Sequence, residues 1–312
     1  MNMEAFVLGT GGMMPLPNRH LTSILLRREG ELFLFDCGEG TQVSLRSLNL
    51  KWKKITTIFI SHTHADHVTG LPGMLMLSAQ VDRDEPLYII GPPRTREYVA
   101  SSRKVLEMYI NFDIIVQEIA NPEVPQVVYT GEGFHIRSIP LAHTRVCVGY
   151  ILEEESRPGV FFPDKAIELG VPRGPMWSRL QQGERVTLED GTVIEPSQVM
   201  GDSRPGRKFS YITDSTRTSG LADEVADSDL LICEGMFESE LSQAAHEKGH
   251  MTAEDAGKLA RDAGGVKQMG LIHYSPRYTN RQLKKLQKEA QAHFPNSFLT
   301  RDQQTISIPY PE

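Results

Sequence analysis

The sequence predicts an α/β sandwich, and two features of the chain support this prediction. Short apolar runs rich in Val, Ile and Phe recur along the 312 residues, and most of them end at a polar or glycine-containing loop. Runs of this kind are typical of buried strands. Segments with helical spacing lie between them. Strands and helices mixed over a chain of this length can bury a sizeable core.

The expected strands fall into two groups, one before about residue 152 and one after about residue 206. Each strand runs from an apolar stretch into a loop. In chain order they lie at 31–40, 56–64, 134–144, 207–216, 229–235 and 268–275. The residues between the two groups are therefore expected to leave the core.

The clearest helix is expected within residues 250–265. Thr252 and Asp255 have the spacing of a capping box, and Gly264 is placed to end the helix. Residues 71–80 are interpreted as a buried helix face, and residues 281–291 as a helix with a solvated face.

Residues 156–206 are predicted to form an inserted flexible arm together with its flanking segments. The chain otherwise is expected to form one domain over residues 1–312. This segment is rich in Pro and Gly and has weak periodicity. A segment so long without clear periodicity is usually functional or disordered. Aromatic and arginine side chains suit RNA through stacking and phosphate contacts, and here they are Phe161, Phe162, Trp177, Arg173, Arg179 and Arg185. The alternative is a lid packed on its own subunit.

Composition and charge exclude several classes of protein. The formal charge of −7, from 33 basic and 40 acidic residues, gives no support to nucleic-acid binding by bulk charge, so such a partner must meet a local basic patch. No apolar stretch approaches the roughly 18 to 20 residues that span a bilayer, and no signal peptide is visible. Cys37, Cys147 and Cys233 are scattered and odd in number, which fits a reducing cytoplasm.

The stretch "SHTHADH" places three histidines and an aspartate within six positions, directly after an expected strand. Alternation points His62 and His64 the same way along an extended segment. The chain then turns toward a helix, so Asp66 and His67 can face the same pocket from its other side. This arrangement suits two metal ions that each need their own histidines.

Three further ligand-type residues follow expected strands, namely His143, Asp214 and His273. Each alone could be an ordinary turn or cap residue. Together they repeat one pattern, a ligand immediately beyond an apolar strand, and in α/β sheets such strand ends line the functional crevice. A carboxylate such as Asp214 can bridge two cations.

The motif H-x-H-x-D-H with these downstream residues resembles the signature of the metallo-β-lactamase superfamily. That resemblance implies a four-layer αβ/βα sandwich and two zinc ions per chain. One zinc ion would be held by His62, His64 and His143. The other would be held by Asp66, His67 and His273, and Asp214 would bridge the two.

Further blocks from about residue 6 to about residue 280 resemble ribonuclease Z, the family of tRNA 3′-processing endonucleases. They are "GTGGMMPLPNRHLTS", "LFDCGEGTQVSLRSLNL", "HADHVTGLPGMLMLSAQ", "KGHMTAEDAG" and "HYSPRY". The arm also resembles that family's tRNA-binding Gly-Pro motif, which implies substrate contacts from Arg173, Gly174, Pro175, Trp177 and Arg179. The resemblance further implies precursor tRNA as partner, a homodimer and a cytoplasmic enzyme.

The chain departs from the family pattern at three places. Cys233 stands where the family usually has histidine, and Thr213 stands where it has glycine before the bridging aspartate. In the loop that the family writes Pro-x-Lys-x-Arg-Asn, Pro17 replaces the lysine and His20 the asparagine, while Arg19 is kept for handling the tRNA end.

Phosphodiester hydrolysis needs a nucleophile, neutralisation of charge and a proton for the leaving oxygen, and the first two are tasks for zinc. The resemblance makes Asp66 the general base. His250, just before the capped helix, is the candidate acid, and Glu234 would orient and charge it. An ordinary loop histidine is the alternative for His250. For the chain as a whole, the alternatives are another hydrolase of the fold, acting on thioesters, lactones or small phosphodiesters, and a non-catalytic protein with structural zinc.

Overall fold

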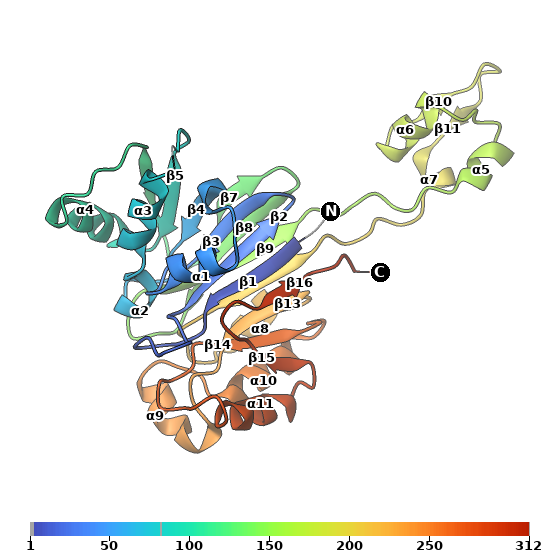
Figure 1. The fold of residues 1–312 in the computed structure, drawn as a ribbon. Coiled ribbons are helices and arrows are strands. Elements are labelled where there is room, and N and C mark those ends of the chain that lie inside the picture. Colours follow the sequence, from blue (N-terminus) through green and yellow to red (C-terminus); the bar gives the residue numbers. More distant parts are fainter. Residues whose placement is uncertain (1–2, 82, 312) are drawn as a thin grey trace. The chain divides into compact units, whose positions relative to one another are not determined.

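The computed structural model describes residues 3–81 and 83–311 and divides the chain into two compact units. The first unit, called the sandwich below, comprises the residues up to Glu153 together with Lys208–Pro309. The second, called the arm, comprises Glu154–Arg207 together with the residues from Tyr310. Figure 1 shows the elements of both units.

Two seven-stranded sheets form the sandwich. The first has the order β16-β1-β2-β3-β4-β5-β6, built from Thr305–Ser307, Met3–Gly9, Ser23–Arg28, Glu31–Phe35, Ile55–Phe59, Leu87–Gly91 and Ile114–Glu118. The second has the order β15-β14-β13-β12-β9-β8-β7, built from Ser297–Leu299, Met269–Ile272, Leu230–Glu234, Lys208–Ile212, Cys147–Glu154, Phe134–Leu141 and Gln126–Gly131.

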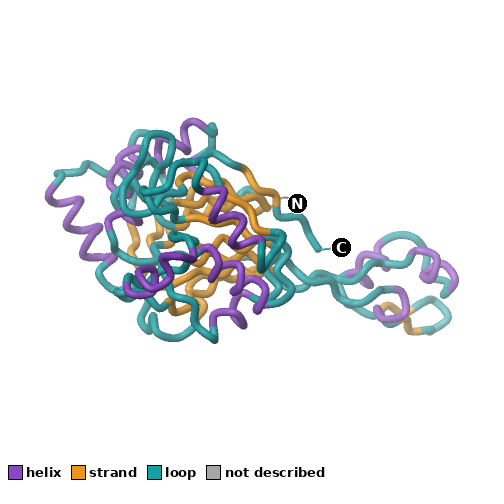
Figure 2. Tube along the Cα trace, turned by 90° about the horizontal axis from the view of Figure 1, so that it is seen from below, coloured by secondary structure: helices purple, strands orange, loops and turns teal. Residues whose placement is uncertain are grey.

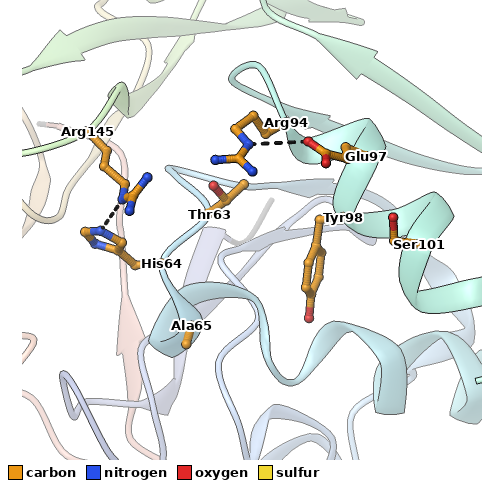
Figure 3. A pocket seen from close by; sticks show the side chains of 8 residues that line it. All are labelled: Thr63, His64, Ala65, Arg94, Glu97, Tyr98, Ser101 and Arg145. Carbon is orange, nitrogen blue, oxygen red and sulfur yellow. Dashed lines mark hydrogen bonds and ion pairs between the residues drawn. The ribbon is translucent and has the colours of Figure 1, made fainter. Parts of the chain in front are cut away.

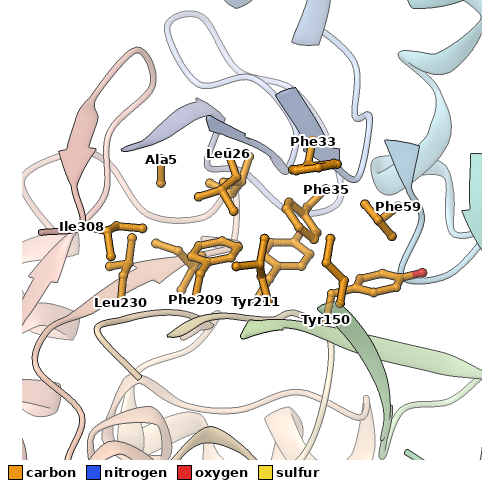
Figure 4. Packing of buried hydrophobic residues seen from close by; sticks show 14 of the residues in the cluster. Ala5, Leu26, Phe33, Phe35, Phe59, Tyr150, Phe209, Tyr211, Leu230 and Ile308 are labelled. Carbon is orange, nitrogen blue, oxygen red and sulfur yellow. The ribbon is translucent and has the colours of Figure 1, made fainter. Parts of the chain in front are cut away.

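The two sheets pack face to face over an aromatic core. Because side chains alternate along a strand, Phe33 and Phe35 of β3 enter this core, whereas Leu32 and Leu34 face the opposite side of the sheet. Phe35 stacks on Phe59 with ring centroids 5.1 Å apart. The second sheet contributes side chains such as those of Tyr150, Phe209 and Tyr211, which meet the phenylalanines across the interface (Figure 4).

Helices cover the outer face of each sheet, so the sandwich has four layers, and the predicted αβ/βα arrangement is confirmed. The helices that pack on the first sheet are α1 (Thr41–Ser47), α3 (Leu71–Ala79) and α4 (Thr95–Val105). Those on the second sheet are α8 (Leu221–Val225), α10 (Ala253–Ala263) and α11 (Leu283–Gln291). Figure 2 shows the strands of the sandwich in the middle, with helices outside them.

Helix α10 begins and ends as the sequence predicted. The Thr252 hydroxyl accepts a hydrogen bond from the Asp255 N–H at 3.1 Å, and the Asp255 carboxylate accepts one from the Thr252 N–H at 3.1 Å. Gly264 ends the helix with a positive φ of 68°. This reciprocal cap fixes the chain direction immediately after His250.

The arm folds around a small hydrophobic cluster of its own, which the weak periodicity did not predict. Its elements are α5 (Pro163–Glu168), α6 (Pro175–Gln181), α7 (Pro196–Val199) and the hairpin of β10 (Val186–Thr187) and β11 (Val193–Ile194). Ala166, Leu180 and Val199 are fully buried in the cluster. Each element is too short to give a clear period, so only their packing reveals the cluster.

Within the described residues, no helix is both long enough and apolar enough to cross a membrane. Cys37, Cys147 and Cys233 are all buried free thiols.

Candidate metal centre and active site

The stretch "SHTHADH" lies at the carboxyl end of β4 in the first sheet. His62 and His64 follow the strand in the loop, and His64 is the extended residue before α2 (Ala65–Val68). Asp66 and His67 lie within this short helix. The change from loop to helix allows the adjacent Asp66 and His67 to join the histidines of the loop, as the sequence predicted.

The second sheet brings the remaining ligand-type residues to the same place. His143 lies just beyond β8, Asp214 just beyond β12, and His273 directly after β14. Strands β12, β13 and β14 pair in parallel, so their carboxyl ends meet at one edge of the sheet.

One group of atoms gathers around Oδ2 of Asp214. His62 Nε2 lies 2.9 Å from His64 Nδ1, and His143 Nε2 lies 3.2 Å from the same nitrogen. Oδ2 of Asp214 is 3.6 Å from His62 Nε2 and 3.7 Å from His143 Nε2.

A second group gathers around the other oxygen of the same carboxylate. Oδ1 of Asp214 lies 3.2 Å from His67 Nε2 and 3.2 Å from His273 Nε2, and the two nitrogens are 3.3 Å apart. Oδ2 of Asp66 lies 3.2 Å from His273 Nε2. Asp214 therefore turns one oxygen toward each group.

These spacings fit metal coordination. Two ligands that each lie about 2.0–2.1 Å from a tetrahedral zinc ion are roughly 3.3–3.4 Å apart, close to the distances in both groups. All the atoms concerned are imidazole nitrogens or carboxylate oxygens, the donors that zinc takes. The two groups can thus hold metal ions.

The buried carboxylates and the imidazole of His67 stabilise one another's charges, whereas His62 is disfavoured as a cation. Burial raises the pKa of Asp214, but His273 and His67 outweigh it and hold this pKa well below its usual value. Burial lowers the pKa of His67, but the carboxylates of Asp214 and Asp36 outweigh it and raise this pKa well above its usual value. Burial, followed by the charge of His67, lowers the pKa of His62.

Asp36 belongs to the site, although the sequence analysis did not select it. It follows β3 with a positive φ of 53°. Its Oδ2 lies 2.7 Å from His67 Nδ1 and accepts a hydrogen bond from the Tyr211 hydroxyl at 2.7 Å, and the Ser61 N–H donates to Oδ1. Partners of this kind fix the orientation of a metal-binding histidine. The signal was present in "FLFDCG", which also places an acid just beyond an apolar strand.

Two backbone groups hold other ligand-type residues in place. His143 Nδ1 lies 2.8 Å from the Gly249 carbonyl oxygen, which leaves Nε2 for the metal. Gly249 has a φ of 72°, and a Cβ atom there would lie 2.8 Å from His143 Nδ1, so the position requires glycine. The Met13 N–H donates to Oδ2 of Asp66 at 2.6 Å.

His250 and Glu234 meet beside the ligand groups. His250 Nδ1 lies 3.3 Å from Oε1 of Glu234, which also accepts a hydrogen bond from the Ser215 N–H. Burial lowers the pKa of His250, but Glu234 outweighs it and raises this pKa to about 9. The ring of His250 packs 5.1 Å from that of His143 and 5.4 Å from that of His273. With Nδ1 on Glu234, Nε2 is the nitrogen that can transfer a proton.

The first two departures from the family pattern have simple structural settings. Cys233 is buried in the cluster between the second sheet and its helices. Thr213 donates a hydrogen bond through its hydroxyl to Oδ1 of Asp214 at 3.0 Å. The threonine thus adds a contact to the bridging carboxylate that a glycine would not make.

Arg19 is turned into the protein. Its side chain is buried and donates to the Tyr278 carbonyl oxygen at 3.0 Å and to Oδ1 of Asn280 at 2.8 Å. The neighbouring His20 places Nδ1 2.8 Å from the Ser44 hydroxyl. These contacts hold the loop whose Met13 N–H reaches Asp66.

The expected substrate residues of the arm lie just before α6 and within it. Arg173, Gly174 and Pro175 are exposed, and Arg179 pairs with Glu184 at 2.9 Å. Trp177 is half-buried, packs 5.1 Å from Phe161 and donates from Nε1 to the Val171 carbonyl oxygen.

Comparison with known proteins gives full-length relatives. Ribonuclease Z of Treponema pallidum (strain Nichols) is 60% identical over 312 residues, covering 100% of this chain and 99% of that protein. Ribonuclease Z of Borreliella burgdorferi (strain ATCC 35210) is 42% identical over 307 residues, covering 97% and 96%. The family model of the anti-Pycsar protein Apyc1 matches residues 3–154, less than half of the chain.

Solved structures show the same fold. Human tRNase Z, short form, superposes with a TM-score of 0.70 at 26% identity, covering 98% of this chain and 99% of that one. The metallo-β-lactamase fold protein YhfI from Bacillus subtilis superposes with a TM-score of 0.68 at 18% identity, covering 98% and 100%. With relatives that match from end to end and a fold shared over nearly the whole length, this chain belongs to the ribonuclease Z family, endoribonucleases built on the metallo-β-lactamase fold.

Proposed function

We propose that this chain is a zinc-dependent endoribonuclease that removes the 3′ trailer from precursor tRNA and leaves a 3′-hydroxyl on the tRNA. The names of its full-length relatives and of the human structure support this substrate. Membership in that family favours this activity over thioester, lactone or small-phosphodiester hydrolysis.

The observation that carries the zinc assignment is the division of the Asp214 carboxylate between two groups of ligands. Oδ2 faces the group of His62, His64 and His143, and Oδ1 faces the group of Asp66, His67 and His273. A structural zinc site is usually closed and four-coordinate. A structural role would therefore not require a second group of metal ligands beside the first. We assign one zinc ion to each group.

Each residue then has a defined task. When bound, the two zinc ions supply a water of lowered pKa and positive charge beside the phosphate. Asp66, held by the Met13 N–H, accepts a proton from the attacking water. His250 donates a proton to the leaving 3′ oxygen, and Glu234 holds its ring and raises its pKa. Arg19 keeps the loop around Met13 in place.

The arm would bind the body of the tRNA through Arg173, Arg179 and the exposed backbone of Gly174 and Pro175. Trp177 would act by fixing the start of α6, since it belongs to the arm's own cluster.

We also propose a homodimer in the cytoplasm. Three apolar side chains at the end of α4 support an interface, because Val105, Leu106 and Tyr109 are 79%, 56% and 85% exposed. Light scattering of the purified protein should give twice the mass of one chain.

The decisive experiment uses the purified protein and a tRNA precursor with a 3′ extension. Mapping both ends of the cut should give a tRNA with a 3′-hydroxyl and a trailer with a 5′-phosphate. Absence of cleavage by a preparation that holds its metal would contradict the proposed function.

A further inference from the structure

The root of the arm, defined as residues 154–158, 203–207, 310 and 311, holds two arginines by protein contacts. Arginines elsewhere can be open to solvent, as are Arg94 and Arg145, which line an open pocket of about 370 Å³ in the sandwich (Figure 3). In the root, by contrast, Arg157 is half-buried and Arg207 is buried. The contacts of these two side chains show which segments of the root are joined.

Two of these segments form an antiparallel ribbon. The Arg157 N–H donates to the Arg204 carbonyl oxygen at 2.7 Å, and the Arg204 N–H donates to the Arg157 carbonyl oxygen at 2.9 Å. The segments also approach closely at Gly206, where a Cβ atom would lie 2.4 Å from the Glu154 carbonyl oxygen. A two-stranded ribbon is marginally stable by itself, so side chains that hold it together matter.

A buried ion pair links the two segments where the arm begins and ends. Arg207 donates from Nη2 to Oε1 of Glu154 and from Nε to Oε2, both at 2.8 Å. The side chains of Arg207 and Glu154 are 0% and 3% exposed. A bidentate pair of this kind has a fixed geometry, so the guanidinium group of Arg207 has a defined place.

The ring of Tyr310 lies between the two arginines. Its centroid is 3.7 Å from Cζ of Arg157 and 3.9 Å from Cζ of Arg207. Two guanidinium groups so close to the centre of one ring would overlap on the same face, so they lie on opposite faces. A cation over an aromatic ring is attracted to it. Arg157 also donates from Nη2 to the Pro311 carbonyl oxygen at 3.4 Å. The segment with Tyr310 is thus bound to one arginine from each side of the ribbon.

This third segment is anchored in the sandwich. Ile308 is fully buried in the core between the sheets, and its N–H donates to the Met3 carbonyl oxygen at 2.9 Å. One residue separates Ile308 from Tyr310, which belongs to the arm. The arm therefore has three chain connections to the sandwich. A unit joined by two neighbouring segments can bend about them, and a third attachment opposes that motion.

We propose that Tyr310 is a positioning residue for precursor tRNA, because its ring between Arg157 and Arg207 restrains the arm at its root. A restrained arm loses less conformational entropy when it binds its substrate. The proposal rests on the proposed function, since it needs an arm that binds tRNA. Tyr310 acts through the arm and takes no part in the chemical step, so its contribution belongs to affinity.

The test separates affinity from chemistry. Tyr310→Leu should weaken binding of precursor tRNA and raise its KM about five-fold, the loss expected when the cation–π contacts are removed. It should leave kcat and the hydrolysis of a nitrophenyl phosphodiester unchanged. The salt dependence of binding should also stay the same, because no phosphate contact is lost. Tyr310→Phe keeps an aromatic ring and should bind like the wild type.

Two comparisons distinguish the root from a direct contact with RNA. Arg157→Gln should weaken binding as Tyr310→Leu does, and the double variant should lose little more, because both changes remove the same contact. In a protein whose residues 160–200 are replaced by a short Gly-Ser linker, Tyr310→Leu should have no effect on tRNA binding. Arg204→Gln is the matched control for charge, since Arg204 is an exposed arginine of the same ribbon.

Arg157→Gln carries the test alone if Tyr310→Leu fails to fold, because it leaves the ring in place. Unchanged tRNA binding, losses that add fully in the double variant, or a loss that persists without the arm would overturn the role of Tyr310. An equal loss in Arg204→Gln would overturn it too. A wild-type protein that cuts no precursor would contradict the proposed function instead.

Discussion

The buried carboxylate of Asp214 depends on its neighbours at the scale of single residues. Only 2% of its surface is exposed, and burial alone would raise its pKa and neutralise it. The surrounding imidazoles reverse this effect and keep it charged. The same balance acts on His250, for which Glu234 outweighs burial. The charges of Asp214 and His250 are thus both maintained by side chains that lie far away in the sequence.

Replacing His250 with alanine should leave the zinc content unchanged and slow cleavage of precursor tRNA by roughly 10²-fold or more, because general acid catalysis is lost. The loss should be smaller with a nitrophenyl phosphodiester, whose leaving group needs no proton. His246→Ala, an exposed histidine on α9 (Ser242–Glu247), is the control. Equal losses on both substrates would assign His250 to phosphate binding instead.

The pH dependence of cleavage should report the pair of His250 and Glu234. His250 acts in its protonated form, which its raised pKa maintains up to about pH 9, so the rate should fall as pH rises through this value. Glu234→Gln removes the carboxylate that raises the pKa, and the alkaline limb should move to lower pH. Rate profiles of both proteins, with Glu247→Gln as control, measure the shift. An unmoved limb would mean that another group titrates.

At the scale of elements, the arm is a small folded unit with its own cluster, so a deletion should remove the whole cluster. A cut at residue 190 would leave β11 and α7 without the cluster that buries Ile194 and Val199. Gly159 and Gly201 are better limits, since a Cβ atom on Gly159 would lie 2.0 Å from the Gly201 carbonyl oxygen. Their backbones are close enough for a short linker.

Replacing residues 160–200 with a short Gly-Ser linker should preserve zinc content and hydrolysis of a small phosphodiester, because every ligand-type residue belongs to the sandwich. Affinity for precursor tRNA should fall ten-fold or more, about 1.4 kcal/mol, and its salt dependence should flatten. Filter binding at several salt concentrations measures both effects. A variant with Arg173 and Arg179 changed to alanine is the matched test of charge. Unchanged tRNA binding in the linker variant would contradict the role of the arm.

At the scale of the whole molecule, the metal centre joins the two sheets. His62, His64, Asp66 and His67 come from the first sheet, whereas His143, Asp214 and His273 come from the second. Ions bound between them would therefore stabilise the folded state of the sandwich, since the unfolded chain does not hold these ligands together.

Removal of metal by a chelator should lower the melting temperature of the wild-type protein, and zinc should restore it. Asp214→Ala should hold fewer ions than the expected two per chain, lose hydrolysis and show little response to the chelator. Metal analysis and thermal scans measure these effects, with Asp223→Ala as a carboxylate control outside the site. A fully active Asp214→Ala variant would refute the bridging role.

The strand ends, the capped helix and the choice of ligand-type residues could all be predicted from local features of the sequence. Alternation and the capping box are local, so His62, His64 and Thr252 could be interpreted from their neighbours in the chain. The clustering of His143, Asp214 and His273 also followed from one repeated local pattern, a ligand directly beyond an apolar strand, and Asp66 followed from the expected turn into a helix.

The groups that these residues face depend on how distant segments pack together. Asp36 touches His67 because β3 lies beside β4, and the inward turn of Arg19 depends on Tyr278 and Asn280, far along the chain. The cluster of the arm likewise joins segments that no local period connects. Side-chain contacts between distant segments depend on packing, and packing has no signature in a single stretch of sequence.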